Sequence, residues 1–371
     1  MTIVSRSLEP DVLYPVGAGA PPMGIIDVRS PVEVARGALP GAHALPLLSD
    51  DERHQVGLCY ARSGQEAALA LGWEITEASL PARITAWRTV AAHGPTAVVC
   101  WRGGLRSRLA TELIDLPEAR PVAGGYKAVR RHVMGSLPAA VGRVPLVVLT
   151  GLTGAGKTEL LEALAGASHG GGAQGPFVLD LERLARHRGS SFGATPAPQP
   201  AQPTFEHDVA SALLLHRAAL VVVEDESRYV GRRTLPPALF DAMRSAPLAV
   251  LETTLDDRIA RVFEGYVRAP ATRDGVEATA AALTEATLRL RRRLGNPRVH
   301  TVLDALERAQ AAWFDPAAHH DWIRLLLEDY YDRLYERNRA TLARPVALRG
   351  DAATLAAALR AHAREHEGNT T

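Results

Sequence analysis

Leu146-Val-Val-Leu-Thr-Gly-Leu-Thr-Gly-Ala-Gly-Lys-Thr158 is the stretch that decides the fold class. Its apolar first part, Leu146–Thr150, predicts a β-strand. Gly151–Thr158 then matches the pattern G-x-x-x-x-G-K-[ST] with no mismatch, and a helical pattern follows over Glu159–Ala165. Strand, glycine-rich loop and helix are the order that this phosphate-binding motif requires. The stretch therefore predicts an α/β domain of the P-loop type.

The loop predicts a binding site for a diphosphate. Gly151, Gly154 and Gly156 let phosphate oxygens approach the backbone, whose amide groups point at them. The ammonium group of Lys157 neutralises the phosphates, and the hydroxyl of Thr158 is a candidate ligand for Mg²⁺. The motif leaves open which phosphorylated molecule binds, and we expect no tightly bound cofactor.

Only two of the 42 lysine and arginine residues are lysines, Lys127 and Lys157. A lysine kept among so many arginines fits a position where a compact ammonium ion is needed. Chance survival in a biased genome is the alternative, but Lys157 lies inside the motif.

A second strand of this half, Ala219–Val223, ends in the acidic residues Glu224 and Asp225. P-loop proteins usually place a metal-binding carboxylate at such a strand end. The two residues are therefore candidate metal ligands, and an acidic strand end exposed to water is the alternative.

A polar loop lies between these two strands. It contains His187, Arg188, Ser190 and Ser191, which place cationic and hydroxyl donors around a glycine. Such donors suit an oxyanion or an RNA phosphate, whereas a plain solvated loop is the alternative.

The first half of the chain predicts another α/β unit. Strand patterns at Gly24–Val28 and Thr96–Cys100 alternate with helical patterns such as Gln65–Leu71 and Leu105–Leu116. This alternation is typical of a parallel sheet.

Cys100 is the candidate catalytic residue of this half. It leaves the carboxyl end of a predicted parallel strand on the loop Trp101-Arg-Gly-Gly-Leu-Arg106, which leads into a helix. Loop amides and the helix N-terminus stabilise a thiolate there, and Arg102 and Arg106 add positive charge. The alternative is a buried, inert cysteine. The other cysteine, Cys59, has no comparable loop and is interpreted as structural.

The composition limits the class of protein. With 371 residues, 47% hydrophobic and 22% charged, the chain can form two or three domains with proper cores. Two cysteines exclude a disulfide framework, and the formal net charge of +1 favours no class of partner. No apolar run is long enough to span a membrane, and the first residues lack a signal pattern, so we expect a cytoplasmic protein without a membrane partner.

Composition shifts suggest where the domains end. We expect a first domain over residues 1–135, a linker over 136–145 and a P-loop domain over 146–270. Residues 271–371 show a helical pattern rich in arginine, without a clear strand.

Several of these segments resemble, in order, the tRNA 2-selenouridine synthases, in which a rhodanese domain is fused to a P-loop domain. The matching stretches are Asp27-Val-Arg-Ser-Pro31, Gln55-Val-Gly57, Cys100-Trp-Arg-Gly-Gly-Leu-Arg-Ser107, Gly124-Gly-Tyr-Lys-Ala128, Gly151–Thr158, Asp180-Leu-Glu182, His187-Arg-Gly-Ser-Ser-Phe-Gly193, Gln202 with Phe205-Glu206, and Glu224-Asp-Glu-Ser-Arg228. The resemblance implies a rhodanese-like α/β domain followed by a P-loop NTPase-like α/β/α domain with a helical C-terminal extension.

The resemblance also implies a chemistry. A 2-thiouridine at the wobble position of tRNA is alkylated on sulfur by geranyl diphosphate, and selenium from selenophosphate then replaces the alkylated sulfur. It assigns Asp27 and Arg29 to the scaffold around the cysteine loop. Lys127 and Arg228 become candidate contacts to the substrate or the tRNA.

The C-terminal region is the candidate tRNA-binding element, because arginines with interleaved aromatic residues contact RNA phosphates and stack on bases. The residues concerned are Arg289, Arg291, Arg292, Arg293, Arg298, Arg333, Arg337, Arg339, Tyr330, Tyr331 and Tyr335. A solvated helix face with core tyrosines is the alternative.

Two other functions stay open at this point. One is a rhodanese-type sulfurtransferase fused to a small-molecule kinase or NTPase, with no RNA substrate. The other is a nucleotide-sensing scaffold without catalysis, which the reactive pattern around Cys100 disfavours.

Overall fold

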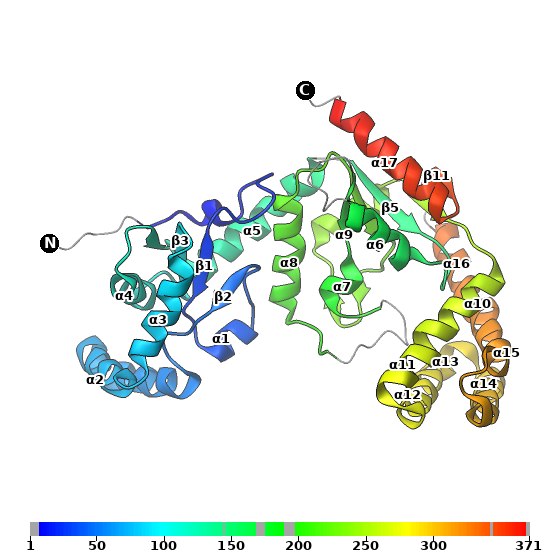
Figure 1. Cartoon of the computed structure of the whole chain (residues 1–371), viewed down its shortest axis with the longest axis horizontal. Helices are drawn as coiled ribbons and strands as arrows, with labels where there is room; N and C mark the ends of the chain where they lie inside the picture. The colour runs from blue at the N-terminus through cyan, green and yellow to red at the C-terminus, as the bar shows by residue number, and fades with distance from the viewer. Residues whose placement is uncertain (1–6, 144, 168–174, 189–196, 342–343, 369–371) are drawn as a thin grey trace. The chain divides into compact units, whose positions relative to one another are not determined.

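A computed structural model describes residues 7–143, 145–167, 175–188, 197–341 and 344–368 (Figure 1). The chain forms two compact units. The first unit contains residues 1–143 and 200–217, and the second unit contains residues 144–199 and 218–371. Each unit is an α/β structure built on a parallel sheet, as the strand and helix patterns predict.

The first unit has a four-stranded sheet in the order β2-β1-β3-β4. Its strands are β1 (Gly24–Asp27), β2 (Ala42–Ala44), β3 (Thr96–Val99) and β4 (Ala119–Pro121). All neighbours are parallel, and β1 and β3 are buried almost throughout. Because parallel strands share one carboxyl edge, the loops that follow β1, β3 and β4 meet there.

Helices connect and cover these strands. They are η1 (Pro10–Leu13), α1 (Pro31–Ala35), α2 (Asp50–Thr76), α3 (Leu80–Ala91), α4 (Leu105–Ile114), α5 (Gly125–Gly142) and α8 (Gln202–Leu215). The helix α2 is kinked at Gly64, which has a positive φ of 83°. The long helices α5 and α8 pack against each other, as Figure 1 shows.

The second unit has a five-stranded parallel sheet in the order β11-β10-β5-β7-β6. Its strands are β5 (Leu146–Thr150), β6 (Phe177–Leu179), β7 (Val221–Glu224), β10 (Leu248–Leu251) and β11 (Val346–Gly350). A short antiparallel pair, β8 (Tyr229–Val230) and β9 (Arg233–Thr234), lies outside this sheet. The strand before the glycine-rich loop is central and every one of its residues is buried.

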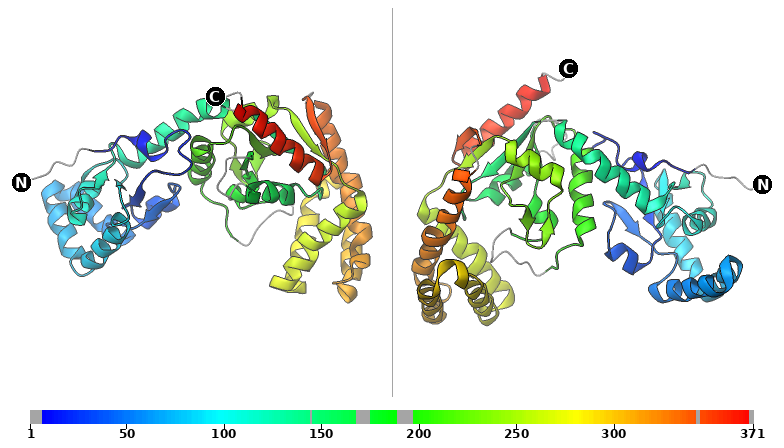
Figure 2. Two further views of the ribbon diagram at one scale, coloured as in Figure 1. Left: turned by 45° about the horizontal axis from the view of Figure 1, so that its top comes forward. Right: turned by 180° about the vertical axis from the view of Figure 1, so that it is seen from behind.

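Helices of the second unit form two groups. The sheet is accompanied by α6 (Lys157–Ala167), α7 (Leu181–Ala185), α9 (Pro237–Ser245) and α17 (Ala352–Gly368), of which α17 packs against β11 and α6 (Figure 2). The others form the rest of the unit, and most of them share a separate core that includes Trp313 and Trp322. They are α10 (Leu255–Phe263), η2 (Glu264–Arg268), α11 (Ala269–Asp274), α12 (Val276–Arg289), α13 (Arg291–Leu294), α14 (Asn296–Ala309), η3 (Gln310–Ala312), α15 (Pro316–Leu326), η4 (Leu327–Asp332) and α16 (Arg333–Thr341).

Three boundaries differ from those expected from composition. Residues 136–142, expected to begin a linker, are the last turns of α5, because alanine, leucine and valine there continue its apolar face. Residues 200–217, expected in the P-loop domain, belong to the first unit. The C-terminal region is not wholly helical, since β11 returns to the edge of the second sheet.

Among the described residues, no helix is both long and apolar enough to cross a membrane.

Candidate active sites

The glycine-rich loop joins the central strand β5 to α6. Gly154 and Gly156 have φ angles of 79° and 92°, a region that favours glycine. A Cβ atom on Gly154 would lie 2.9 Å from the carbonyl oxygen of Arg258. The Lys157 ammonium group donates to the carbonyl oxygen of Gly151 at 3.0 Å. The side chain therefore lies folded over the loop in which an anion would sit.

This loop forms the floor of a cavity of about 770 Å³, which also contains Thr158. Its wall has basic, acidic and apolar parts, and the acidic side chains are Glu159, Glu162, Glu182, Glu224, Asp225 and Glu226. The basic side chains other than Lys157 are Arg188, Arg228, Arg244, Arg261 and Arg344. The large apolar and aromatic side chains are Phe240, Met243, Leu248, Val262, Tyr266, Tyr331, Leu334 and Tyr335. The cavity can hold an anion and an apolar group together.

The predicted acidic strand end is present, but the two carboxylates have different surroundings. Asp225 accepts hydrogen bonds from Thr150 Oγ1 and from an Arg344 guanidinium nitrogen, both at 2.7 Å. Glu224 is buried and accepts a hydrogen bond at 3.1 Å from the backbone N–H of Glu182. These bonds fix both carboxylates in the cavity wall.

Three glutamates line the cavity, of which Glu224 is buried and Glu182 and Glu226 are half-buried, and burial is the main cause that raises their pKa values. The pKa of Glu182 rises to about 7, that of Glu226 to about 8 and that of Glu224 to about 9. Repulsion from neighbouring carboxylates adds to each rise, whereas the charge of Lys157 acts to lower the pKa values of Glu182 and Glu226. At pH 7 these glutamates are therefore partly protonated, and together they repel a bound diphosphate less than three ionised carboxylates would.

The acidic strand end does not form a metal cluster with other side chains. Within the described ranges, no group of three or more histidine, cysteine or acidic residues is arranged to hold a metal ion. Thr158 lies at the start of α6 and lines the cavity. An ion held by Thr158 would take its remaining ligands from phosphate oxygens and water.

The sequence analysis missed Arg258, which supports the loop from below. Its side chain is 4% exposed and forms a two-pronged ion pair with Asp332, at 2.6 and 3.0 Å. Its Nε donates to the Thr153 carbonyl oxygen at 2.8 Å. The available signal was its place in an amphipathic helix with Thr254 at the N-cap, directly after a buried strand.

The polar loop expected near residue 190 is partly described. Arg188 lines the cavity, donates to the Gly265 carbonyl oxygen at 3.0 Å and lies over the Tyr266 ring. Burial lowers the pKa of His187, which favours the neutral form of this side chain. Ser190 and Ser191 lie outside the described residues. Arg228, expected from the resemblance, also lines the cavity.

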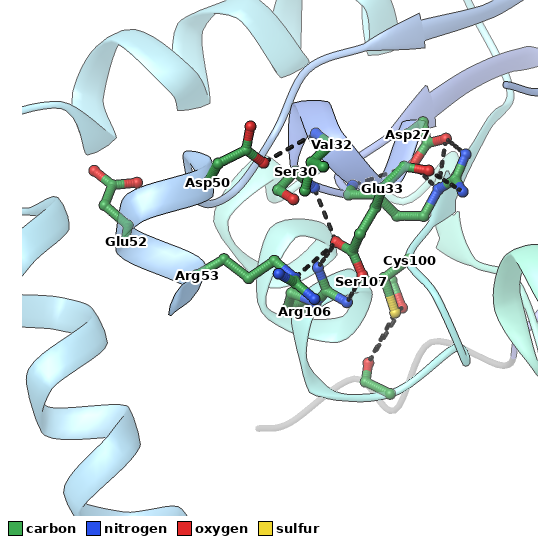
Figure 3. A network of polar contacts seen from close by, with 12 residues as sticks. Asp27, Ser30, Val32, Glu33, Asp50, Glu52, Arg53, Cys100, Arg106 and Ser107 are labelled. Atoms are coloured by element: carbon green, nitrogen blue, oxygen red, sulfur yellow. Dashed lines mark hydrogen bonds and ion pairs between the residues drawn. The ribbon is translucent and has the colours of Figure 1, made fainter. Parts of the chain in front are cut away.

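The first unit carries the second candidate site, at the end of β3 (Figure 3). Cys100 is the first residue after this strand and is 3% exposed. Its Sγ lies 3.2 Å from the hydroxyl oxygen of Ser107, on the first turns of α4. Ser107 was quoted only as part of the resemblance, yet it is the side-chain hydroxyl that touches the sulfur.

The guanidinium group of Arg106 points to Glu33, with which it forms an ion pair, as Figure 3 shows. Two of its nitrogens reach the Glu33 carboxylate, at 2.5 and 3.0 Å, and Arg53 lies 3.5 Å from it. Burial acts to raise the pKa of Glu33, but the bonds from Arg106 and Ser30 and the charge of Arg53 outweigh it and lower that pKa. Part of the Arg106 charge expected at the cysteine is therefore neutralised.

The cysteine loop packs backbone to backbone against the loop before α5. A Cβ atom on Gly103 would lie 2.5 Å from the Val122 carbonyl oxygen, and one on Gly125 would lie 2.2 Å from the Cys100 carbonyl oxygen. The ammonium group of Lys127 lies 5.9 Å from the centre of the Trp101 ring. The expected residue Lys127 thus belongs to the surroundings of the cysteine loop.

Asp27 and Arg29 form a fully buried ion pair, with a shortest distance of 2.6 Å. Arg29 also donates to the carbonyl oxygen of Gly37 at 2.8 Å and lies 3.9 Å from the centre of the Tyr126 ring. These contacts join the loops after β1 and β4 and fit the scaffold role that the resemblance implies.

A cavity of about 780 Å³ opens over Cys100. Its basic side chains are Arg36, Arg53, His54, Arg102 and Arg106, and its large apolar side chains are Leu48, Val56, Leu58, Tyr60, Trp101 and Leu105. Arg102, expected from the sequence, therefore faces the same space as Cys100. Cys59 lies half-buried on α2.

The arginines and tyrosines of the C-terminal region are only partly available to a partner. Tyr330 is buried and packs edge to face on Tyr331, so the structure favours the alternative of a core tyrosine for this residue. Tyr331 and Tyr335 line the P-loop cavity. Arg298 and Arg333 share Asp329, whereas Arg291 and Arg292 are exposed.

Comparisons with known proteins agree on one family. A family model described as the tRNA 2-selenouridine synthase AAA domain matches residues 144–366. A tRNA 2-selenouridine synthase of Hahella chejuensis is 42% identical, over 91% of this chain and 90% of that protein. One of Cupriavidus necator is 40% identical, over 92% of this chain and 95% of that protein.

Proposed function

Because the chain belongs to the tRNA 2-selenouridine synthase family, we propose that it replaces sulfur by selenium in wobble 2-thiouridine of tRNA. The reaction proceeds in two steps. The P-loop cavity transfers a geranyl group from geranyl diphosphate to the sulfur. The Cys100 cavity then delivers selenium from selenophosphate.

The observation that carries this proposal is the composition of the P-loop cavity. Lys157 and the loop amides suit a diphosphate. The apolar and aromatic side chains of the wall, such as Phe240 and Tyr335, offer a contact surface for a prenyl chain. In the first step the carbon–oxygen bond of geranyl diphosphate breaks and diphosphate leaves with the electron pair. The thiouridine sulfur forms the new bond to carbon, and the proton of the base passes to water.

The second step suits the other cavity. Arg102 and the partly neutralised Arg106 favour the selenophosphate anion in the cavity, where the Cys100 side chain contacts it without forming a bond to selenium. Selenium attacks the ring carbon and the carbon–sulfur bond breaks, so that geranylthiolate leaves with the electron pair. Water cleaves the phosphorus–selenium bond and phosphate is released.

The deciding experiment is mass spectrometry of wobble nucleosides after incubation with thiolated tRNA, geranyl diphosphate and selenophosphate. Cys100→Ser should accumulate S-geranylated nucleoside without selenouridine, whereas Cys59→Ser should behave like the wild type. Lys157→Ala loses a charge-assisted contact of about 1.5–3 kcal/mol and should weaken donor binding roughly tenfold or more.

The main alternative is an NTPase or small-molecule kinase without an RNA substrate. ATP turnover that ignores both tRNA and geranyl diphosphate, together with unmodified nucleosides, would favour that alternative. If Cys100→Ser stops geranylation as fully as selenation in a folded protein, the division of the two steps between the cavities is wrong.

A further inference from the structure

One side of the cavity over Cys100 is apolar. Binding of a small anion does not explain this side. Leu58, Tyr60 and Leu105 line it and are 43%, 59% and 41% exposed. Large apolar side chains left this open to water are costly unless they contact something apolar. Because these three side chains line the cavity that contains Cys100, they indicate an apolar ligand at this site.

The arrangement is built into α2. Two sets of residues at helical spacing on α2 line the cavity. One set is Arg53, Val56 and Tyr60, and the other is His54 and Leu58. The helix thus presents a cation near its start and apolar side chains in its following turns. Leu105, at the start of α4, adds to the apolar side.

We propose that this apolar wall, Val56, Leu58, Tyr60 and Leu105, binds the geranyl chain of the S-geranylated tRNA during selenation. The inference rests on the proposed function and deepens it. In the intermediate, the ring carbon that selenium attacks carries an apolar chain on its sulfur. A site that serves it has to admit an anion and an apolar chain together, and the cavity has a cationic and an apolar side.

The wall also makes the second step selective. A thiouridine that has not been alkylated has no chain to place on it and would bind more weakly. Burial of the methylene groups of the longer chain against this wall adds favourable free energy to its binding. A chain covered only in part should therefore favour the geranylated substrate over a short S-alkyl analogue by at least about tenfold in kcat/KM.

The test uses two synthetic anticodon stem–loop RNAs, one with S-geranyl-2-thiouridine and one with S-methyl-2-thiouridine at the wobble position. The full-length protein and selenophosphate are added, and formation of selenouridine is followed. The two leaving groups are both alkylthiolates, so the ratio of the two rates reports mainly on the chain. We expect the wild type to prefer the geranyl RNA and Leu58→Ser with Tyr60→Ser to lose at least tenfold of that preference.

Two further variants keep the result interpretable. Trp73→Ser removes another exposed apolar side chain of α2, 45% exposed, that lies outside this cavity, and should keep the preference. Tyr60→Leu keeps an apolar side chain without an aromatic ring and should keep most of it. A loss of rate with both RNAs in Tyr60→Leu would instead indicate base stacking and overturn the inference.

Failure of the inference is distinguishable from failure of the proposed function. If the wild type forms selenouridine from both RNAs at equal rates, or the double variant keeps its preference, the inference is wrong and the function stands. If the wild type forms no selenouridine from the geranyl RNA, the proposed function itself fails.

Discussion

Each candidate site contains a buried glutamate with a shifted pKa: the shift is downwards for Glu33 in the first unit and upwards for Glu224 in the second. In the first unit, Glu33 gains ion pairs on folding, which lower its pKa, so the stability that it contributes is lost as the pH falls through that lowered value. In the second unit, burial raises the pKa of Glu224 to about 9. Its contribution is complete below pH 4.5, the ordinary value, and is lost as the pH rises towards 9.

Glu224→Gln should remove that loss. Glutamine keeps an acceptor for the Glu182 N–H but carries no charge at any pH. The variant should match the wild type below pH 4.5 and be more stable at pH 9 by at least about 1.4 kcal/mol, which is the equivalent of one pKa unit. Urea unfolding across this pH range measures the difference.

Glu252→Gln is the control, since that side chain is 52% exposed and pairs with Arg349 at the surface. It should leave the pH dependence unchanged. Equal stability of Glu224→Gln and the wild type at pH 9 would mean that Glu224 ionises freely in the folded protein.

At the scale of elements, the position of the cysteine loop depends on a second loop far along the chain. The backbone N–H of Tyr126, at the start of α5, donates to the Cys100 carbonyl oxygen at 2.8 Å. Gly125 makes this approach possible because it has no side chain and a φ of 56°. The start of helix α5 therefore fixes the backbone of Cys100, the residue at which the cysteine loop begins.

Gly125→Ala should displace this loop. Its Cβ would meet the Cys100 carbonyl oxygen, and the backbone angle alone costs about 1–2 kcal/mol for a residue other than glycine. We expect at least a tenfold loss of selenation while S-geranylated nucleoside still forms. Gly104→Ala is the control within the cysteine loop, because no atom lies within 4 Å of its Cβ. Equal losses in both variants would contradict the close packing.

At the scale of the whole molecule, the two units are not consecutive in sequence. The helix α8 belongs to the first unit although it lies between β6 and β7 of the second. It packs on α5, and the Ala38 N–H donates to Thr204 Oγ1 at 3.0 Å. A chain segment inside the P-loop half thereby completes the cysteine half.

Phe205→Ala should consequently weaken the first unit. Phe205 is fully buried in α8, and removing such a side chain costs about 3–5 kcal/mol. Hydrogen exchange should accelerate in α5 and β3 and stay near wild-type rates in β5 and β7. Val222→Ala, a buried strand residue of the second unit, should give the reverse pattern. Faster exchange confined to β5 and β7 in Phe205→Ala would contradict this assignment of α8.

The sequence by itself determined what local patterns encode. The strand Leu146–Thr150, the glycine-rich loop and the following helix are all present, because a buried strand, glycines and a helix start leave a local signature. The position of Cys100 after a buried strand was likewise predictable. So was the parallel character of both sheets, since strands and helices alternate.

Only the tertiary structure decided which distant residues meet. The pairing of Arg106 with Glu33, the support of the loop by Arg258 and Asp332, and the return of β11 to the sheet each join segments far apart in sequence. The membership of α8 in the first unit is a fact of the same kind. Hydrophobic burial and ion pairing act through space and depend on the folded neighbours, so a residue's own segment carries no record of them.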